Sequence, residues 1–330
     1  METAAAKDDA AASVPLDRRQ APLLLFDYGR DTTTASEASD ADAGFIFYSI
    51  PKKQITPQGW MLMAAPAGSP DTETFLCDPL FIGRRVDLPP DTEGFLKGDS
   101  RKRCLLSRKS VTAGDPGLLV LVVDLTDTVL WYCRLGGNEG WLRHEYEPAA
   151  LGDAVLESMS AHLTLVDGKF FMDLGDKVVT LELSPEPVFS VFPVDRDRER
   201  SPPCTCFTSQ LVESGGDLFD VCFRFSDIGG RFVAGIDVLK LDLSAGAWVK
   251  TESLGGSTFV VHPRELGASL DPQEVGLKGD CIYYYMPGDK ALHVYDMERG
   301  TTTLHNPFPF FPDHCSHYKI LMPTQTVLNV

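Results

Sequence analysis

The chain of 330 residues is 43% hydrophobic and 23% charged, a composition typical of globular proteins with a large core and unlike that of disordered chains. Its 30 Lys and Arg residues and 47 Asp and Glu residues give a net charge of −17. This charge repels a phosphate backbone, so we expect no nucleic-acid partner. No apolar stretch approaches the roughly 18 residues of a membrane span, so we expect no membrane partner.

Two low-complexity segments surround the first apolar strand. Residues 1–20 are Ala-rich and polar without periodicity, which predicts a disordered tail, and Asp8 and Asp9 argue against a secretory or transit peptide. Residues 31–43 form an acidic loop insertion within a single domain that spans residues 21–330. The eight cysteines mostly lie in apolar strands without a disulfide-like spacing. We therefore expect a reduced, intracellular protein of the cytoplasm, the nucleus or both.

A recurring unit organises the rest of the chain: an apolar strand, a turn position, and a second β-prone segment that opens six residues later. The five clear copies run from Asp78 to Arg84, Leu135 to Trp141, Glu182 to Val188, Asp242 to Trp248 and Asp296 to Thr302. A weaker sixth copy runs from Ser49 to Ile55. Because one hairpin cannot bury its own apolar face, repeated hairpins predict a radially repeated all-β fold, the β-propeller.

Strand-length apolar runs group into four-stranded blades over residues 103–145, 159–193, 206–254 and 258–304. A shorter unit at residues 59–88 and the opening segment at residues 23–55 precede them. We predict a kelch-like propeller of about six blades, with seven as the alternative, and almost no helix. Residues 317–322 have no blade of their own, and we expect them to pair with the opening segment, because an open propeller leaves sheet edges unpaired.

The sequence contains none of the motifs that position a nucleophile or a phosphate: no Gly-x-Ser-x-Gly elbow, Gly-rich phosphate loop or His-Glu-x-x-His pair. Ser269 lies between Gly267 and Asp271, but a predicted loop position with no motif for a nearby histidine favours an ordinary serine. We therefore predict no catalytic residue and no enzymatic activity.

Metal-binding residue types gather at two places. Cys204 and Cys206 lack a second pair at zinc-ribbon spacing. The second group, near the C-terminus, consists of His305, His314, Cys315 and His317. It fits no tight ligand template, and the prolines within it indicate an extended connection. We predict no metal site, no cofactor-binding residue and no cofactor.

Other conspicuous groups have structural interpretations. The run from Asp195 to Arg200 alternates in sign, which favours a solvated loop between blades, with a charged docking segment as the alternative. The tyrosines at 283–285 alternate across a strand, so Tyr284 should face away from its neighbours and the cluster should pack. Trp141 and Trp248 each open a strand after a turn, and we expect both rings to cover a blade.

The order of the motifs resembles that of a known family. Its pattern GWLLL … FLLNPLSGRRIPLPP is matched by residues 59–62 (GWML), 75–80 (FLCDPL) and 83–90 (GRRVDLPP). Further matches follow at residues 133–136 with Trp141, 167–171, 211–218, 238–242 with Trp248, 253–255 and 276–283. Over about residues 22–325 the chain resembles the plant F-box-associated β-propellers of the kink-suppressor type, formerly a domain of unknown function.

In that family the propeller recruits a target protein, while an N-terminal F-box docks on the Skp-type adaptor of a cullin ubiquitin ligase. The segment before the first predicted strand carries no F-box pattern. The resemblance therefore implies a propeller-only, monomeric, protein-binding module without direct contact to a Skp-type adaptor. Two alternatives stay open: an enzyme that uses carboxylates or histidines in the central channel, and a degenerate relative without a defined role. The partner and the residues that bind it are not predicted.

Overall fold

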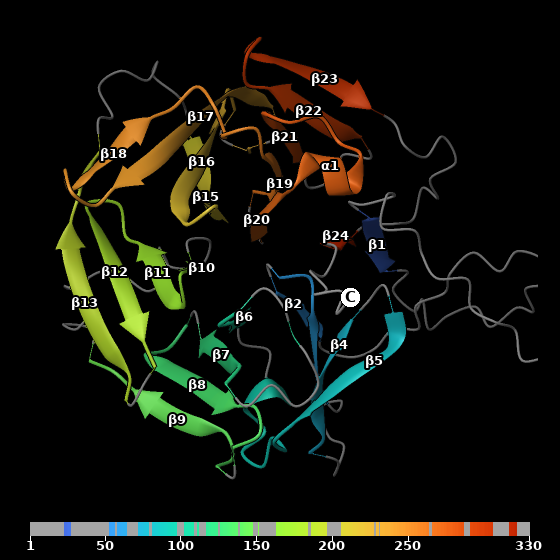
Figure 1. The fold of residues 1–330 in the computed structure, drawn as a ribbon, viewed down its shortest axis with the longest axis vertical. Coiled ribbons are helices and arrows are strands. Elements are labelled where there is room, and N and C mark those ends of the chain that lie inside the picture. Colours follow the sequence, from blue (N-terminus) through green and yellow to red (C-terminus); the bar gives the residue numbers. More distant parts are fainter. Residues whose placement is uncertain are drawn as a thin grey trace, which may run out of the picture.

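Mostly antiparallel sheets set around a ring make up the part of the chain that the computed structural model describes (Figure 1). The described residues are 23–27, 53–56, 58–64, 72–78, 81–97, 102–108, 111, 117–124, 126–137, 139–147, 151, 163–183, 186–196, 206–227, 229–230, 232–263, 266–286, 291–305 and 317–321. The predicted tail at residues 1–20 and the predicted insertion at residues 31–43 lie outside them.

Five sheets are blades, numbered here along the chain. Blade 1 consists of β2 (Lys53–Ile55), β3 (Met61–Ala64), β4 (Thr74–Asp78) and β5 (Phe81–Leu88). Blade 2 consists of β6 (Lys102–Leu106), β7 (Leu119–Asp124), β8 (Val129–Arg134) and β9 (Leu142–Glu145). Blade 3 consists of β10 (Leu163–Val166), β11 (Lys169–Asp173), β12 (Lys177–Glu182) and β13 (Val188–Pro193).

Blades 4 and 5 each gain a fifth strand. In blade 4 the order is β14 (Asp195–Arg196), β18 (Ala247–Lys250), β17 (Val233–Asp242), β16 (Asp217–Phe225) and β15 (Cys206–Ser214). In blade 5 the order is β20 (Leu266–Leu270), β19 (Thr258–His262), β21 (Cys281–Tyr284), β22 (Leu292–Asp296) and β23 (Thr301–His305). The short helix α1 (Pro272–Val275) connects β20 to β21, which lies parallel to β19. A 3-10 turn, η2 (Phe95–Lys97), follows blade 1.

The two ends of the described chain meet in a sixth, two-stranded sheet. β1 (Leu23–Asp27) pairs antiparallel with β24 (His317–Leu321), from Leu23 opposite Leu321 to Asp27 opposite His317. The predicted pairing of the opening and closing segments is therefore confirmed. The pairing joins residues about 300 positions apart in sequence. The entropic cost of closing such a loop is modest, because it grows only slowly with loop length.

The all-β propeller is confirmed, but the described residues form five blades and not the predicted six or seven. Each of the five clear hairpin units coincides with one antiparallel pair: β4–β5, β8–β9, β12–β13, β17–β18 and β22–β23. The weak sixth unit has a different place, because Ile55 lies in β2, which pairs with β3 at the inner edge of blade 1 (Figure 1). Of the remaining described residues, β1 and β24 form the one further sheet.

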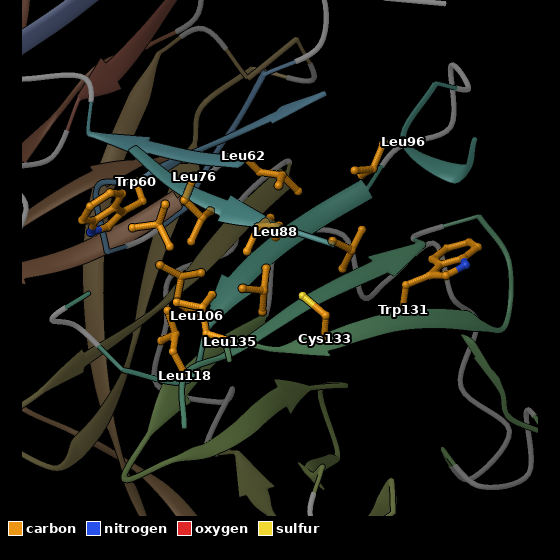
Figure 2. Packing of buried hydrophobic residues seen from close by; sticks show 14 of the residues in the cluster. Trp60, Leu62, Leu76, Leu88, Leu96, Leu106, Leu118, Trp131, Cys133 and Leu135 are labelled. Atoms are coloured by element: carbon orange, nitrogen blue, oxygen red, sulfur yellow. The ribbon is translucent and has the colours of Figure 1, made fainter. Parts of the chain in front are cut away.

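The core lies between neighbouring blades. Alternation along β7 directs Val120 and Val122 into the cluster between blades 1 and 2, and Leu121 and Val123 into the cluster between blades 2 and 3. Figure 2 shows the first cluster, where Trp60 of blade 1 lies among leucines of both blades. Each fully buried aliphatic side chain of this kind contributes about 1.5–3 kcal/mol to folding. β7 is buried on both faces and therefore packs blade 2 against blade 1 on one side and blade 3 on the other.

The predicted packing of the aromatic groups is also confirmed. Tyr284 lies in the cluster between blades 4 and 5, whereas Tyr283 and Tyr285 lie in a separate cluster on the other face of blade 5. Trp248 is buried between blades 3 and 4. Trp141 packs against the cluster between blades 1 and 2, and its Nε1 donates to the carbonyl of Pro89 at 2.7 Å.

Candidate functional site: a groove between blades 4 and 5

A groove of about 880 Å³ lies between blades 4 and 5. One wall comes from β16, β17 and the segment after β18, and the other from the residues before β21 and the turn between β22 and β23. Four cationic and five acidic side chains line it, together with Tyr295. The lining is thus dominated by charged groups of both signs.

Asp237 organises the blade 4 wall. Its Oδ2 accepts a hydrogen bond from Nε of Arg224 at 2.6 Å, and its Oδ1 accepts one from Nζ of Lys250 at 2.7 Å. Burial disfavours the charged carboxylate, but the hydrogen bonds from Lys250 and Arg224 outweigh it and hold the pKa of Asp237 below its usual range. The cluster of these three residues carries a net positive charge because two cations share one anion.

A glycine makes room for this arrangement. Gly235 pairs with Arg224 across β16 and β17, and a Cβ at position 235 would lie only 2.4 Å from Nη2 of Arg224. The guanidinium therefore lies close over the backbone of β17 at Gly235 and reaches Asp237 two residues further along the same face. A side chain at position 235 would displace the guanidinium from the groove wall.

Asp296 organises the blade 5 wall in a similar way. It ends β22, and its Oδ2 accepts a hydrogen bond from Nζ of Lys278 at 2.6 Å. Its Oδ1 accepts one from the backbone N–H of Arg299 at 3.1 Å, and Nε of Arg299 lies 3.8 Å from Oδ2. The hydrogen bond from Lys278 and that from the Arg299 backbone lower the pKa of Asp296. A second cluster of two cations and one carboxylate thus faces the groove.

Asp280 ties the two walls together. Its Oδ1 accepts hydrogen bonds from the backbone N–H of Leu254 at 2.6 Å and from Oγ of Ser253 at 2.9 Å, both on the segment after β18. Asp280 has a φ of 51°, a left-handed conformation that Asp tolerates better than most residues. The preceding Gly279 is required by space, since a Cβ there would lie 2.5 Å from the carbonyl oxygen of Gly256. These contacts hold the segment before β21 closely against the segment after β18.

The resolved pKa shifts all move groups away from neutral pH. Burial raises the pKa of the Cys77 thiol to about 11 and that of Tyr146 to about 12. Carboxylates with a resolved shift have lowered pKa values. For Asp124, hydrogen bonds from Thr126 and Lys102 outweigh the effect of burial on its pKa.

Within the described residues, no group of three or more His, Cys, Asp or Glu side chains is placed to hold a metal ion.

Ser269, which the sequence placed in a loop, belongs to β20, and this expectation was wrong. Its Oγ lies 2.8 Å from Oγ of Ser214, which also donates to Oγ of Ser257 at 3.1 Å. The three hydroxyls link blades 4 and 5, and inserted strand β20 is what brings Ser269 to blade 4. Cys206 begins β15, and its Sγ lies 3.3 Å from the carbonyl of Asp227.

The other metal-type residues are not brought together by any described contact. His305 ends β23 and His317 begins β24, while Cys204, His314 and Cys315 lie outside the described residues. No helix in the described ranges combines the length and apolar character needed to cross a bilayer.

The charged run that begins at Asp195 was predicted to be a solvated loop, and this was wrong for Arg196. Asp195 and Arg196 form β14, which adds to blade 4 parallel to β18. The Arg196 side chain is only 10% exposed and donates to Asp173 of blade 3 and Asp220 of blade 4. Residues 197–200 lie outside the described ranges. The alternating charges suggested pairing between sequence neighbours, but the partners of Arg196 lie on other strands.

No residue of the groove was predicted from sequence. The available signal was a charged residue inside a strand, as at Arg224 and Asp237, where a blade should bury its faces. Such positions indicate a buried ion pair or a site. Only the strand register shows that these two side chains meet.

Comparisons with known proteins agree with the fold. The model of the KIB1-4 beta-propeller family matches residues 47–304. The search of curated proteins found no match.

Solved structures resemble the chain only remotely. The Kluyveromyces lactis protein Hsv2 has a TM-score of 0.33 and 9% identity, over 76% of this chain and 61% of that one. The N-terminal domain of Nup159 has a TM-score of 0.27 and 10% identity, over 76% of this chain and 63% of that one. The chain spans about three fifths of the length of the Hsv2 and Nup159 structures it matches, and at these TM-scores the likeness supports no inference about function.

Proposed function

The chain belongs to the KIB1-4 β-propeller family, and we propose that it is a non-enzymatic module that binds a protein partner in the groove between blades 4 and 5. The observation that carries this proposal is the pair of aspartate-centred clusters, Asp237 with its cations on one wall and Asp296 with its cations on the other. Charged groups held on two rigid blades favour selection of a partner by complementary charge. Pockets for small molecules are lined mostly by apolar side chains.

The pKa directions support the non-enzymatic part of the proposal. A general acid or base works best with a pKa near the working pH. In the described residues, burial moves the pKa of Cys77 upward and hydrogen bonding moves that of Asp296 downward, both away from neutrality. Neither direction prepares its group to transfer a proton at neutral pH, which supports a non-enzymatic role.

We further propose that the chain acts as a monomer in the cytoplasm or the nucleus, in a role like that of the substrate-recruiting propellers of F-box ubiquitin ligases. The support for this role is the motif resemblance in the sequence. None of the six described cysteines forms a disulfide bond, which suits a reducing compartment. We propose no direct contact with a Skp-type adaptor.

The experiment is affinity purification of the tagged chain from its native tissue, followed by mass spectrometry. The test variant reverses two exposed cations of the groove, Lys250→Glu and Arg299→Glu. The matched control is Lys169→Glu, which reverses an exposed lysine that pairs with Glu182 far from the groove. Thermal unfolding of each variant checks that the propeller is intact.

We expect a specific protein partner that the control retains and the groove variant loses. A partner recovered equally by both variants would place binding elsewhere and contradict the groove assignment. A stable tagged chain that recovers no specific partner would contradict the binding function itself. Recovery of a cullin with its adaptor alongside the partner would link the module to a ligase.

A further inference from the structure

β13 differs from the outer strands of the other blades in the described chain. β5 and β9 carry charged residues within the strand, the usual protection of a sheet edge, and β18 is covered by β14. β23 holds three threonines, a leucine and a histidine. β13, with the sequence VFSVFP, contains no charged residue and lies at the rim of blade 3 (Figure 1). Its edge has neither the charged residues of β5 and β9 nor, among the described residues, a covering strand like β14.

The apolar side chains of β13 are exposed on both faces of the strand. Val188, Val191 and Phe192 are 55%, 41% and 42% exposed. Phe189 alone packs inward, with its ring 5.0 Å from that of Tyr146 in blade 2. Alternation sends odd and even positions to opposite faces, so apolar surface is available on either side of a partner strand.

No strand of the described residues pairs with the outer edge of β13. The N–H of Val194 donates to the backbone carbonyl of Asp176 and so continues the β12–β13 ladder. The backbone N–H and C=O groups of the even-numbered residues of β13 therefore point toward β12. The N–H and C=O groups of Phe189 and Val191 therefore point away from β12. Pro193 faces the same way and has no N–H, so it leaves no donor unpaired there. Beyond the strand the same edge is already paired, since the N–H of Asp195 donates to the carbonyl of Gly246 at 2.7 Å. The chain after β13 thus already pairs with blade 4 along this edge, and β13 itself presents backbone groups that can pair with another strand.

Charge at the ends of β13 indicates the partner's chemistry. Exposed carboxylates of Glu182 and Glu186 lie at its beginning, and those of Asp176 and Asp195 at its end. The lysines nearest in the ladder are Lys169, which pairs with Glu182, and Lys177. A second copy of the chain would oppose the same carboxylates and a net charge of −17.

We propose that β13 is a docking strand for an extended apolar peptide segment with Lys or Arg at its ends, which adds to blade 3 by β-augmentation. Main-chain hydrogen bonds to Phe189 and Val191 provide affinity, apolar contacts to Val188, Val191 and Phe192 select apolar side chains, and the end carboxylates select basic flanks. This surface is separate from the groove and does not depend on it.

The test uses the full chain and a short synthetic peptide of alternating Val and Thr with paired lysines at both ends. Fluorescence anisotropy measures binding, and hydrogen–deuterium exchange reports the Phe189 and Val191 amides. The test variant is Val191→Pro, which removes an outward N–H and leaves the β12 ladder its donors. The control is Leu304→Lys, another exposed apolar residue on an outer strand.

We expect saturable binding, slower exchange at both amides, an affinity loss of about tenfold or more in Val191→Pro, and no change in Leu304→Lys. The same peptide N-methylated along one edge should lose binding to the unmodified chain, so the proposal stays testable if Val191→Pro fails to fold. A glutamate-flanked peptide should bind more weakly. Equal binding by the N-methylated peptide, absence of binding, or a dimer in sedimentation that Val191→Pro disrupts would each overturn the proposal.

Discussion

Arg196 and Asp220 form a buried ion pair in which Nη1 donates to Oδ2 at 2.5 Å. Nη2 of the same guanidinium donates to Oδ2 of Asp173 at 2.5 Å, and the guanidinium carbon lies 5.0 Å from the centroid of the Trp248 ring. Asp173 ends a strand of blade 3, whereas Asp220 and Trp248 belong to blade 4. One side chain therefore joins two blades through two carboxylates and an aromatic face.

Replacing Arg196 should destabilise the propeller strongly. Arg196→Leu leaves the carboxylates of Asp173 and Asp220 buried without this cation, and loss of one partner of a buried pair costs about 3–5 kcal/mol. Urea unfolding followed by tryptophan fluorescence measures the change in the free energy of unfolding. The control, Lys169→Ala, breaks an ion pair that is half exposed and should cost less than about 1 kcal/mol. Equal costs for the two variants would contradict the bridging role of Arg196.

Gly267 should not tolerate alanine. Its Cβ would lie 2.7 Å from Cγ2 of Val212 and 3.0 Å from the carbonyl oxygen of Leu211, because β20 lies directly against β15 of blade 4. Gly267→Ala should lower the free energy of unfolding by about 1–3 kcal/mol through overpacking. Gly140→Ala is the matched control, since nothing lies within 4 Å of its Cβ position. A neutral Gly267→Ala would show that the contact between these blades is loose.

Removing β24 should weaken the propeller. Deletion of residues 317–330 takes away the strand that pairs with β1 in the described chain, from Leu321 to His317. The melting temperature should fall by about 2–4 °C for each kcal/mol of lost pairing. Deletion of residues 322–330 keeps β24 and serves as the control, with a melting temperature close to that of the full chain. An unchanged melting temperature in the longer deletion would mean that the β1–β24 sheet contributes nothing to stability.

Stability should fall in acid partly through Asp237. Its pKa is lowered from the ordinary value of 3.8 in the folded chain, so below that value the unfolded chain binds the proton more readily than the folded one. The contribution of Asp237 is present above pH 3.8 and is lost as the pH falls through the folded pKa. Asp237→Asn should therefore be less stable at neutral pH and lose less stability on acidification. Urea midpoints across the acid range measure both slopes, and parallel slopes would contradict the assignment.

The hairpins were predictable because their chemistry is local. In the turn after β17, Oδ1 of Asp242 accepts the N–H groups of Ser244 and Ala245, and the strand resumes near Trp248. The turn after β22 follows the same logic, since Oδ1 of Asp296 accepts the N–H of Arg299, and each of the five clear units belongs to one blade. The sixth predicted blade was the opening segment at residues 23–55, but the structure pairs β1 with β24 and places β2 in blade 1.

The additions to blades 4 and 5 were not predictable from local pattern. Nothing near Arg196 in the sequence indicates that Asp173 and Asp220 will surround it, since those residues lie on other strands. The groove depends likewise on register: Arg224 reaches Asp237 because Gly235 lies opposite it. These contacts depend on the register between strands, and the pattern of a single sequence does not predict that register.

The most direct test of the binding account is hydrogen–deuterium exchange of the chain alone and in complex with the partner recovered by affinity purification. The account predicts slower exchange in residues 250–253 and 297–300, the segments that form the two walls of the groove. Protection should be absent in the complex-incompetent variant with Lys250→Glu and Arg299→Glu. Protection confined to other blades, with both groove segments unchanged, would contradict the central claim that the partner docks between blades 4 and 5.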